Sequence, residues 1–319
     1  MKRSFQTAVL PAFLLASFAA QSQTYDASDI SFSAFAKTAC TANSQGVVTP
    51  PTPGQNCNLQ PEVQQVTLYR LFECTTKPTA PTSSTAANLT NCAPMYSNSA
   101  GQTITVTKTA TSALTGTTRP ANATYTHAYV EISPSWQVKA KATFSSAMSD
   151  SNGTTSGTQC WSIANAANNG NLFNWSIRTQ GSMDLVTKCG TTTDSTYAAT
   201  TIVTNSFDGS SFVNAVTNAP ISNGGTTSLT NKLDTYLLAS SGFLATPGNP
   251  AVNNANSVSK IGAVLTLPTS LTISSATTGM TFSVNNSMGT QIATQSGVNP
   301  SRVSFFTTGP ADFTLTTTP

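Results

Sequence analysis

The stretch TYTHAYVEISPSWQVKAKATF, residues 124–144, decides the fold that we expect for this chain. From Trp136 to Phe144, apolar side chains occupy every second position and polar side chains occupy the positions between them. This period of two is typical of a half-buried antiparallel strand. Residues 124–132 alternate in the same way, and a Ser-Pro-Ser segment at 133–135 separates the two runs. Because proline suits a turn better than a strand interior, the stretch predicts a β-hairpin that turns at this segment.

The same periodicity recurs in short segments along most of the chain. Besides the hairpin, the expected strands cover residues 29–36, 63–74, 102–108, 160–163, 172–179, 183–189, 197–207, 211–217, 261–267, 271–273, 280–284, 303–307 and 313–316. Residues 271–273 are expected to pair with residues 280–284 across a Thr-Thr-Gly turn. Residues 229–237 place leucines at helical spacing but fit a strand equally well. Many short strands with turns between them predict an all-β protein of two antiparallel β-sandwich-like domains with disulfide-stapled loops.

The first 22 residues have the features of a secretory signal peptide. Lys2 and Arg3 precede a mostly apolar run over residues 8–20, and small side chains follow at the expected cleavage site after Ser22. No other segment approaches the roughly 20 apolar residues of a membrane helix, so no transmembrane segment is expected. The mature protein is therefore predicted to be secreted or held at the cell surface.

Composition suggests a division of the mature chain into two domains. Residues 23–147 are expected to form an N-terminal β domain with Cys-bracketed loops, and residues 160–319 a C-terminal β domain. Residues 148–159 are small and polar and include two glycines, which favours a linker.

All 6 cysteines follow the predicted signal peptide. An even number of cysteines in an exported chain indicates disulfides, and six cysteines allow 15 pairings that sequence cannot distinguish. We expect neighbours to pair: Cys40 with Cys57, Cys74 with Cys92, and Cys160 with Cys189. Because no CxxC spacing or nearby histidine supports a metal site, neither a metal nor another cofactor is expected.

Charge excludes a nucleic-acid partner and favours self-association. The net charge of +3 becomes +1 when Lys2 and Arg3 leave with the signal peptide (3 − 2 = 1), and no basic patch remains. Charged residues make up 8% of the chain, against about 25% in an ordinary globular protein. Hydroxyl and amide side chains supply the polarity instead, so electrostatic repulsion between copies is weak.

The catalytic side-chain types are scarce. His127 is the only histidine, and Ser156 in GTTSG stands one position too late for a nucleophile elbow. Asp150 begins DSNGT, which resembles the first part of a calcium loop but lacks the acidic residues that complete it, so a plain Asn-Gly turn is favoured. No catalytic residue is assigned and the protein is predicted not to be an enzyme. A secreted carboxylate-dependent hydrolase stays an alternative, because two acids facing each other are enough for glycoside hydrolysis.

Aromatic residues offer a candidate ligand-binding surface. Tyr125, His127 and Tyr129 alternate along one strand face that we expect to be polar and solvent-facing. Such a face could bind surface glycans, which gives a secreted carbohydrate-binding, lectin-like module as an alternative function. The tryptophans at positions 136, 161 and 175 are expected to pack in the core, because apolar residues share their strand faces.

The segment DISFSAFA, residues 29–36, has two interpretations. Its apolar residues are Ile30, Phe32, Ala34 and Ala36. It is either the first strand of its own domain or a donor strand that completes the sheet of a neighbouring copy. Export, the scarcity of catalytic side-chain types and the low charge predict a non-enzymatic extracellular structural or adhesive protein. The donor-strand interpretation adds that it is possibly a filament or layer subunit that assembles by β-strand addition.

Overall fold

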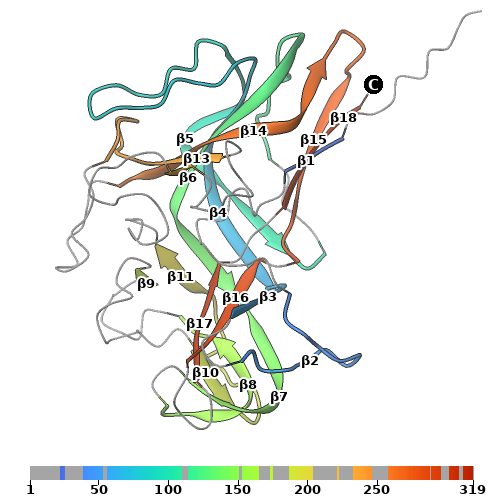
Figure 1. Cartoon of the computed structure of the whole chain (residues 1–319), viewed down its shortest axis with the longest axis vertical. Helices are drawn as coiled ribbons and strands as arrows, with labels where there is room; N and C mark the ends of the chain where they lie inside the picture. Colours follow the sequence, from blue (N-terminus) through green and yellow to red (C-terminus); the bar gives the residue numbers. More distant parts are fainter. Residues whose placement is uncertain are drawn as a thin grey trace, which may run out of the picture.

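The protein is all-β, and its described strands form three sheets (Figure 1). The computed structural model describes residues 22–25, 39–52, 56–109, 114–150, 153–164, 173–174, 187–203, 221–222, 233–245, 258–287, 289–295, 302–308 and 312–318. Within these ranges there is no helix, which confirms that the fold is all-β. Accordingly, no helix in this part of the chain could cross a membrane.

The strands differ greatly in length, from two residues to seventeen. In chain order they are β1 (Ser22–Tyr25), β2 (Val47–Val48), β3 (Asn56–Leu59), β4 (Val63–Cys74), β5 (Cys92–Thr107), β6 (Ala123–Lys139), β7 (Lys141–Ser149), β8 (Ser156–Ser162), β9 (Phe173–Asn174), β10 (Thr187–Gly190), β11 (Thr200–Val203), β12 (Ile221–Ser222), β13 (Leu233–Leu238), β14 (Lys260–Ile273), β15 (Gly279–Asn285), β16 (Thr290–Gln295), β17 (Arg302–Thr308) and β18 (Asp312–Thr318).

Three sheets of unequal size contain these strands. The eight-stranded sheet has the order β12-β13-β14-β6-β11-β9, with β4 between β5 and β6. The seven-stranded sheet has the order β10-β8-β7-β17-β16-β3, and β2 pairs with β7. The third sheet has only three strands, in the order β1-β18-β15.

The predicted hairpin at residues 124–144 is wrong, although its alternation is correct. Strand β6 runs without a turn through Ser133, Pro134 and Ser135 and pairs with β4 on both sides of them. The register shifts here, so this segment is a bulge, a position where a strand tolerates proline. The bulge also lies where the neighbour of β6 changes from β14 to β11.

Beyond Ala140 the chain leaves the eight-stranded sheet and enters the seven-stranded one as β7. The alternate residues that were expected to face a core are buried on both sides of this point: Val138 at the end of β6, then Ala140, and Ala142 and Phe144 on β7. Their core, which also contains Ile292 and Val303, lies within the seven-stranded sheet. The apolar face was therefore predicted correctly and its strand partner was not.

The predicted linker, residues 148–159, contains the ends and turn of the β7–β8 hairpin. Met148 pairs with Gly157 and Ser149 pairs with Ser156. Gly153 has a φ of 71°, a left-handed conformation that suits glycine in a turn. Strands from both predicted domains enter both large sheets, so the two-domain division and the sandwich-like arrangement are not confirmed.

The structure decides two further predictions, one on the type of an element and one on the pairing of two strands. Residues 229–237 were compatible with a helix or a strand, and Leu233–Leu238 forms strand β13. The expected pairing of residues 271–273 with 280–284 is wrong, because β14 pairs there with β6 and β15 pairs with β18. The predicted strand at 63–74 has the bounds of β4, and the one at 102–108 is the end of the longer β5.

Three disulfides join the neighbouring cysteines, in the expected pairing. They are Cys40–Cys57, Cys74–Cys92 and Cys160–Cys189. The last two join residues that are directly opposite on paired strands, β4 with β5 and β8 with β10. Their Cα atoms are 4.0 and 4.1 Å apart, as in the closely spaced pairs of an antiparallel ladder.

Candidate functional site

The three-stranded sheet brings together segments that are far apart in the sequence (Figure 1). Strand β1 pairs antiparallel with β18 through four register pairs, from Ser22 with Thr316 to Tyr25 with Phe313. On its other side β18 pairs along its whole length with β15. Among the strands that the structure describes, β1 and β15 are the outer members of this sheet, and outer strands are where backbone N–H and C=O groups can pair with another chain.

The residues predicted as a donor strand, Ile30, Phe32, Ala34 and Ala36, lie outside the described part of the chain. The predicted signal peptide lies outside it as well, except for Ser22, which belongs to β1. In this region the structure describes one strand, Ser22–Tyr25, which precedes the segment that alternation selected. Only its pairing partner could have revealed it, because SQTY has no alternating apolar pattern.

Tyr125, His127 and Tyr129 do not form an exposed aromatic row. Tyr125 is 2% exposed and packs in the core of the eight-stranded sheet, whereas Tyr129 is 1% exposed and packs with Tyr236 and Leu238. Both faces of β6 are covered at this point, so the expectation of one solvent-facing polar face was wrong. Alternation shows that two faces differ but not that either is wet.

His127 is half-buried at the end of the β4–β6 ladder. Its Nδ1 lies 2.9 Å from the hydroxyl of Thr126. Burial lowers its pKa and the Lys77 ammonium adds to this, while Asp234 opposes it. Lys77 and Asp234 form an ion pair of 2.6 Å. The imidazole is therefore biased toward its neutral form beside a neutralised pair of charges.

Glu131, on the face of β6 that also carries Tyr129, is a buried acid that contacts side chains of other strands. Its carboxylate, 2% exposed at the residue level, accepts hydrogen bonds from the Tyr129 hydroxyl at 3.0 Å and Lys260 Nζ at 2.9 Å. Arg70 Nη1 also donates, at 3.4 Å. These groups come from β4, β6 and β14, so the cluster ties three neighbouring strands together.

Gly262 makes room for this cluster. It pairs with Glu131 across the ladder, and a Cβ placed on it would lie 2.7 Å from Leu238 and 3.3 Å from the Tyr129 hydroxyl. Sequence reasoning missed the cluster, because its residues are distant in the chain and each looks like an ordinary residue on a polar strand face. With two cations and a hydroxyl bound to it, this carboxylate is held as a structural anion.

A second buried acid, Glu73, lies one position before Cys74 on β4 and is 1% exposed. In the described part of the protein, its Oε2 has no hydrogen-bond partner. Burial raises the pKa of Glu73 to about 8. The side chain is therefore largely protonated at neutral pH, and a neutral acid is what an apolar environment favours.

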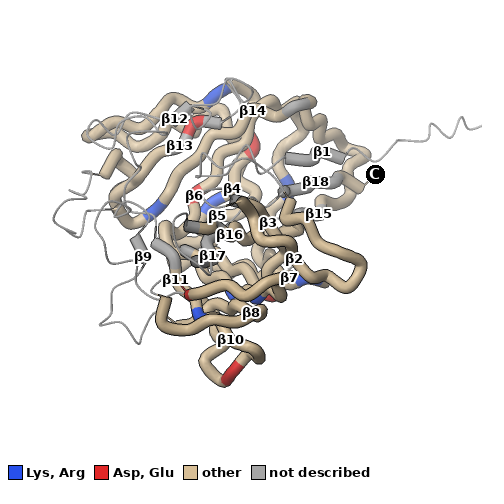
Figure 2. Tube along the Cα trace, turned by 60° about the horizontal axis from the view of Figure 1, so that its bottom comes forward, with Lys and Arg blue, Asp and Glu red and all other residues tan. Residues whose placement is uncertain are grey.

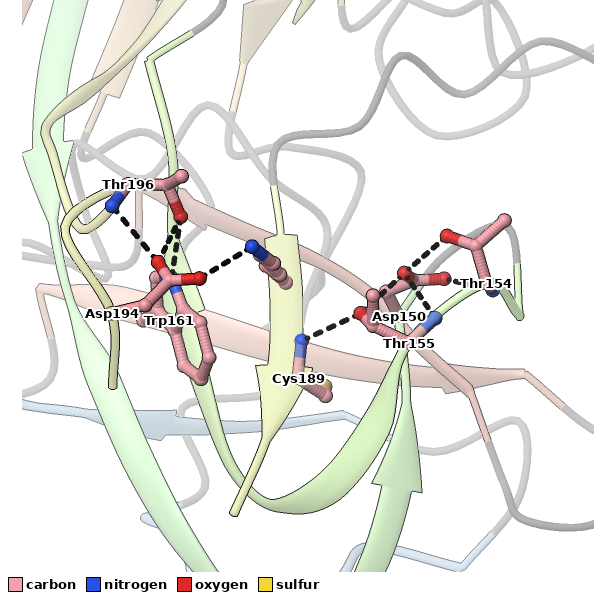
Figure 3. Close-up of polar contacts among 8 residues, drawn as sticks. Asp150, Thr154, Thr155, Trp161, Cys189, Asp194 and Thr196 are labelled. Atoms are coloured by element: carbon pink, nitrogen blue, oxygen red, sulfur yellow. Dashed lines mark hydrogen bonds and ion pairs between the residues drawn. The ribbon is translucent and has the colours of Figure 1, made fainter. Parts of the chain in front are cut away.

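Two threonine-bound aspartates flank β10 (Figure 3). Asp150 accepts hydrogen bonds from the backbone N–H and the hydroxyl of both Thr154 and Thr155, at 2.6–2.9 Å. Burial acts to raise the pKa of Asp150, but the hydrogen bonds from Thr155 and Thr154 together lower it. The DSNGT segment is thus closed by its own threonines, in accordance with a turn.

On the other side of β10, Asp194 is more exposed. It forms an ion pair with Lys188 and accepts hydrogen bonds from the N–H and hydroxyl of Thr196. These interactions, with Lys188 first, lower the pKa of Asp194 to about 2. Trp161 Nε1 donates to the Thr196 hydroxyl at 3.1 Å, which connects this loop to the core of the sheet.

The tryptophans that the structure describes are used for packing. Trp161 is 1% exposed, and Trp136 is half-buried against the core of the eight-stranded sheet. Trp175 lies outside the described residues. The two described tryptophans therefore follow the core interpretation and give no flat aromatic surface for a sugar.

Charge is sparse and scattered over the trace (Figure 2). In the described ranges, no group of three or more His, Cys, Asp or Glu side chains could hold a metal ion. Comparisons with known protein families, with curated proteins and with solved structures found no match for this chain. The candidate site is the three-stranded β1–β18–β15 sheet, with β1 and β15 as its outer strands among the described residues.

Proposed function

We propose that this protein is an exported, non-enzymatic structural or adhesive component of a cell surface or extracellular layer, and that its copies associate by β-strand addition. The observation that carries the proposal is the small β1–β18–β15 sheet, in which β1 and β15 are the outer strands among the residues that the structure describes. An edge strand is a template for another strand, because its outward N–H and C=O groups have no ladder partner within the sheet.

The rest of the molecule is compatible with this role. Three disulfides and an all-β fold suit a protein that must persist outside the cell, where thiols oxidise. A charged fraction of 8% means that copies repel one another weakly. Secretion through residues 1–22 and a sandwich-like, two-domain organisation belong to the same proposal.

The two alternatives have less support. A carbohydrate-binding module would need an exposed aromatic row, but Tyr125, Tyr129 and Trp161 are buried. A carboxylate-dependent hydrolase would need acids that are free to act. Glu131 is instead held by donors from its own strand and a neighbouring strand, and Asp150 by donors from its own turn.

The proposal is tested by electron microscopy of the protein taken from its native surface or medium, beside size-exclusion chromatography of the recombinant mature chain. Filaments or ordered layers are expected in the native material. Monomers from both sources at every concentration would refute the proposal and direct attention to ligand binding, with a glycan array as the next measurement.

A pair of lysine variants makes the test specific for the edge. Lysines at Thr281 and Ser283 on β15 should weaken assembly, because natural sheets use edge lysines to prevent strand addition. Lysines at Thr41 and Gln45, exposed residues beside β2, add the same charge elsewhere and should leave assembly unchanged. Equal effects of the two pairs would mean that charge alone, and not the β15 edge, controls association.

A further inference from the structure

The Cys74–Cys92 disulfide differs from the other two in the residue beside it. Cys74 on β4 lies directly opposite Cys92 on β5 and, on its other side, directly opposite His127 on β6. Directly opposed residues of an antiparallel ladder point to the same face, with Cβ atoms about 4.5–5.5 Å apart. His127, Cys74 and Cys92 therefore form one row across three adjacent strands, with the imidazole next to Cys74.

The other disulfides have an apolar residue in the equivalent position. Cys160 on β8 lies opposite its partner Cys189 on β10 and, on its other side, opposite Ala142 on β7. Cys57 on β3 lies opposite Ile292 on β16. The disulfide on β4 is thus the one of the three with an ionisable side chain in this position.

The two cysteines of this disulfide differ in exposure. Cys74 is fully buried in a core cluster with Tyr129, Tyr236 and Leu238, whereas Cys92 is partly exposed. Among the described strands β5 pairs with β4 alone, so Cys92 lies on an outer strand. Access decides which sulfur of a disulfide an attacking thiolate reaches. An external thiol can therefore approach Cys92 from the outer side of β5, and Cys74 is then the sulfur that leaves.

Hydrogen bonds determine the tautomer of His127. The Thr126 hydroxyl donates its one proton to the Thr75 carbonyl at 2.8 Å, so toward His127 Nδ1, 2.9 Å away, it can only accept. In the neutral imidazole Nδ1 therefore carries the proton, and Nε2 is the basic nitrogen. Protonation of Nε2 gives an imidazolium in the row beside Cys74. A neighbouring imidazolium lowers the pKa of a thiol, which makes its thiolate a better leaving group.

We propose that Cys74–Cys92 is a thiol-exchange site, at which a small external thiol forms a mixed disulfide with Cys92 and His127 assists the departure of Cys74. The thiolate sulfur of the external thiol bonds to Cys92 Sγ, the bond between the two cysteines breaks, and its electron pair goes to Cys74 Sγ. The imidazolium stabilises the new thiolate or protonates it from Nε2. This exchange involves no net oxidation. The reactivity goes beyond the proposed structural role and does not depend on it.

The other two disulfides are controls within the same molecule. The folded, oxidised protein is treated with reduced glutathione, free thiols are trapped with an alkylating reagent at successive times, and each cysteine is quantified by mass spectrometry. Cys74–Cys92 should open first, with glutathione on Cys92. Cys160–Cys189 controls for the cross-strand geometry, because Ala142 lies beside it. Cys40–Cys57 controls for exposure, because Cys40 is partly exposed and Ile292 lies beside its partner.

The matched variant is His127→Ala, which places beside Cys74 the residue type that lies beside Cys160. It should slow the opening of Cys74–Cys92 roughly three- to tenfold, the effect of a thiol pKa lowered by about 1–2 units with a Brønsted coefficient of about 0.5. The rates of the other two bonds should not change, which also shows that the variant is folded. Opening of Cys74–Cys92 no faster than that of the control bonds in the unmodified protein, or an unchanged rate in His127→Ala, would overturn the proposal.

The pH profile of the unmodified protein tests the same role without a substitution. The ratio of the two cross-strand opening rates cancels the ionisation of glutathione, and it should rise as pH falls from about 7 to about 5, because the imidazolium forms in this range. Burial and then Lys77 lower the pKa of His127, and Asp234 opposes them, so the rise is expected toward the acidic end. Burial raises the pKa of the other titratable groups near the row, which keep their protons here: Glu73, Tyr129 and Tyr236. A ratio that does not vary with pH would overturn the assistance by His127.

Discussion

Two regions of the molecule bury a carboxyl group equally but shift its pKa in opposite directions. Glu73 on β4 of the eight-stranded sheet and Asp150 at the end of β7 in the seven-stranded sheet are each 1% exposed. Burial raises the pKa of Glu73 to about 8, since its Oε2 has no partner among the described residues. Asp150 accepts four hydrogen bonds from two threonines, which lower its pKa although burial opposes them.

The difference shows that burial alone does not decide the charge of an acidic side chain in this protein. The deciding factor is the number of donors that its own turn or strand supplies. At Asp150, threonine hydroxyls and backbone N–H groups stabilise the buried carboxylate, whereas lysine and arginine do so at Glu131. The hydroxyl side chains therefore stabilise a buried acid in addition to making the surface polar.

Each region also has a disulfide that joins opposed strands. Cys74–Cys92 lies next to Glu73 on β4, whereas the backbone N–H of Cys189 donates to the Thr155 hydroxyl beside Asp150. The two regions thus have the same covalent constraint and different electrostatics, which allows the two contributions to be measured separately.

The largest effect is expected from pH at Glu73. The ordinary pKa of 4.5 holds in the unfolded chain and the folded value is about 8, so the folded protein retains a proton that the unfolded chain has lost. The free energy of unfolding should therefore fall as pH rises from 4.5 to about 8, by at most about 5 kcal/mol. Urea unfolding across this range should show the decline in the unmodified protein and not in Glu73→Gln, which mimics the protonated acid. An equal decline in both would mean that Glu73 is not its source.

Removal of one disulfide should have the next largest effect. The Cys74–Cys92 and Cys160–Cys189 bonds close loops with sequence separations of 18 and 29 residues. Replacing either pair with alanines should cost roughly 3 kcal/mol in the chain-entropy model, and the longer loop about 0.4 kcal/mol more. Urea unfolding of the two double variants, each oxidised, measures this. A difference of several kcal/mol between them would show that local packing, and not loop closure, controls the contribution of each bond.

Asp150→Asn should destabilise the hairpin by about 2 kcal/mol at neutral pH, because an amide group accepts fewer of the four threonine hydrogen bonds than a carboxylate. The pKa of Asp150 is lowered in the fold, so its contribution is present above the ordinary value of 3.8 and is lost as pH falls through the folded value. The difference in the free energy of unfolding between the variant and the unmodified protein should therefore become smaller in acid. The matched control is Asp194→Asn, which makes the same replacement at the more exposed aspartate across β10. A difference independent of pH would exclude the charge of Asp150 as the cause.

The smallest effect is expected at the partly exposed pair of Lys188 and Asp194. Lys188→Met should change the free energy of unfolding by less than about 0.5 kcal/mol, because solvent screens an ion pair of this kind. The change should disappear at high salt, which unfolding in concentrated sodium chloride would reveal. A loss above about 2 kcal/mol would place the pair among the buried interactions, together with the cluster around Glu131.

Much of the local structure follows from the sequence alone. The bounds of β4, the period of two from Trp136 to Phe144 and the all-β class come from side-chain alternation, which is a local property. The neighbour pairing of cysteines also agrees with the structure, since a short loop between two β-forming segments returns the chain to the adjacent strand. Export, self-association and the absence of catalysis stay predictions.

Pairing between distant segments was decided only by the tertiary structure. Alternation says which residues share a face, but it does not name the strand that lies alongside or whether both faces are covered. For this reason Pro134 lies in a bulge and not a turn, β15 pairs with β18 and not with β14, and Tyr125 and Tyr129 are both buried. The same limit hid the four-residue strand β1, whose identity depends on the partner that it meets some 290 residues later. Local periodicity determined the elements of this protein, and long-range hydrogen bonding determined how they meet.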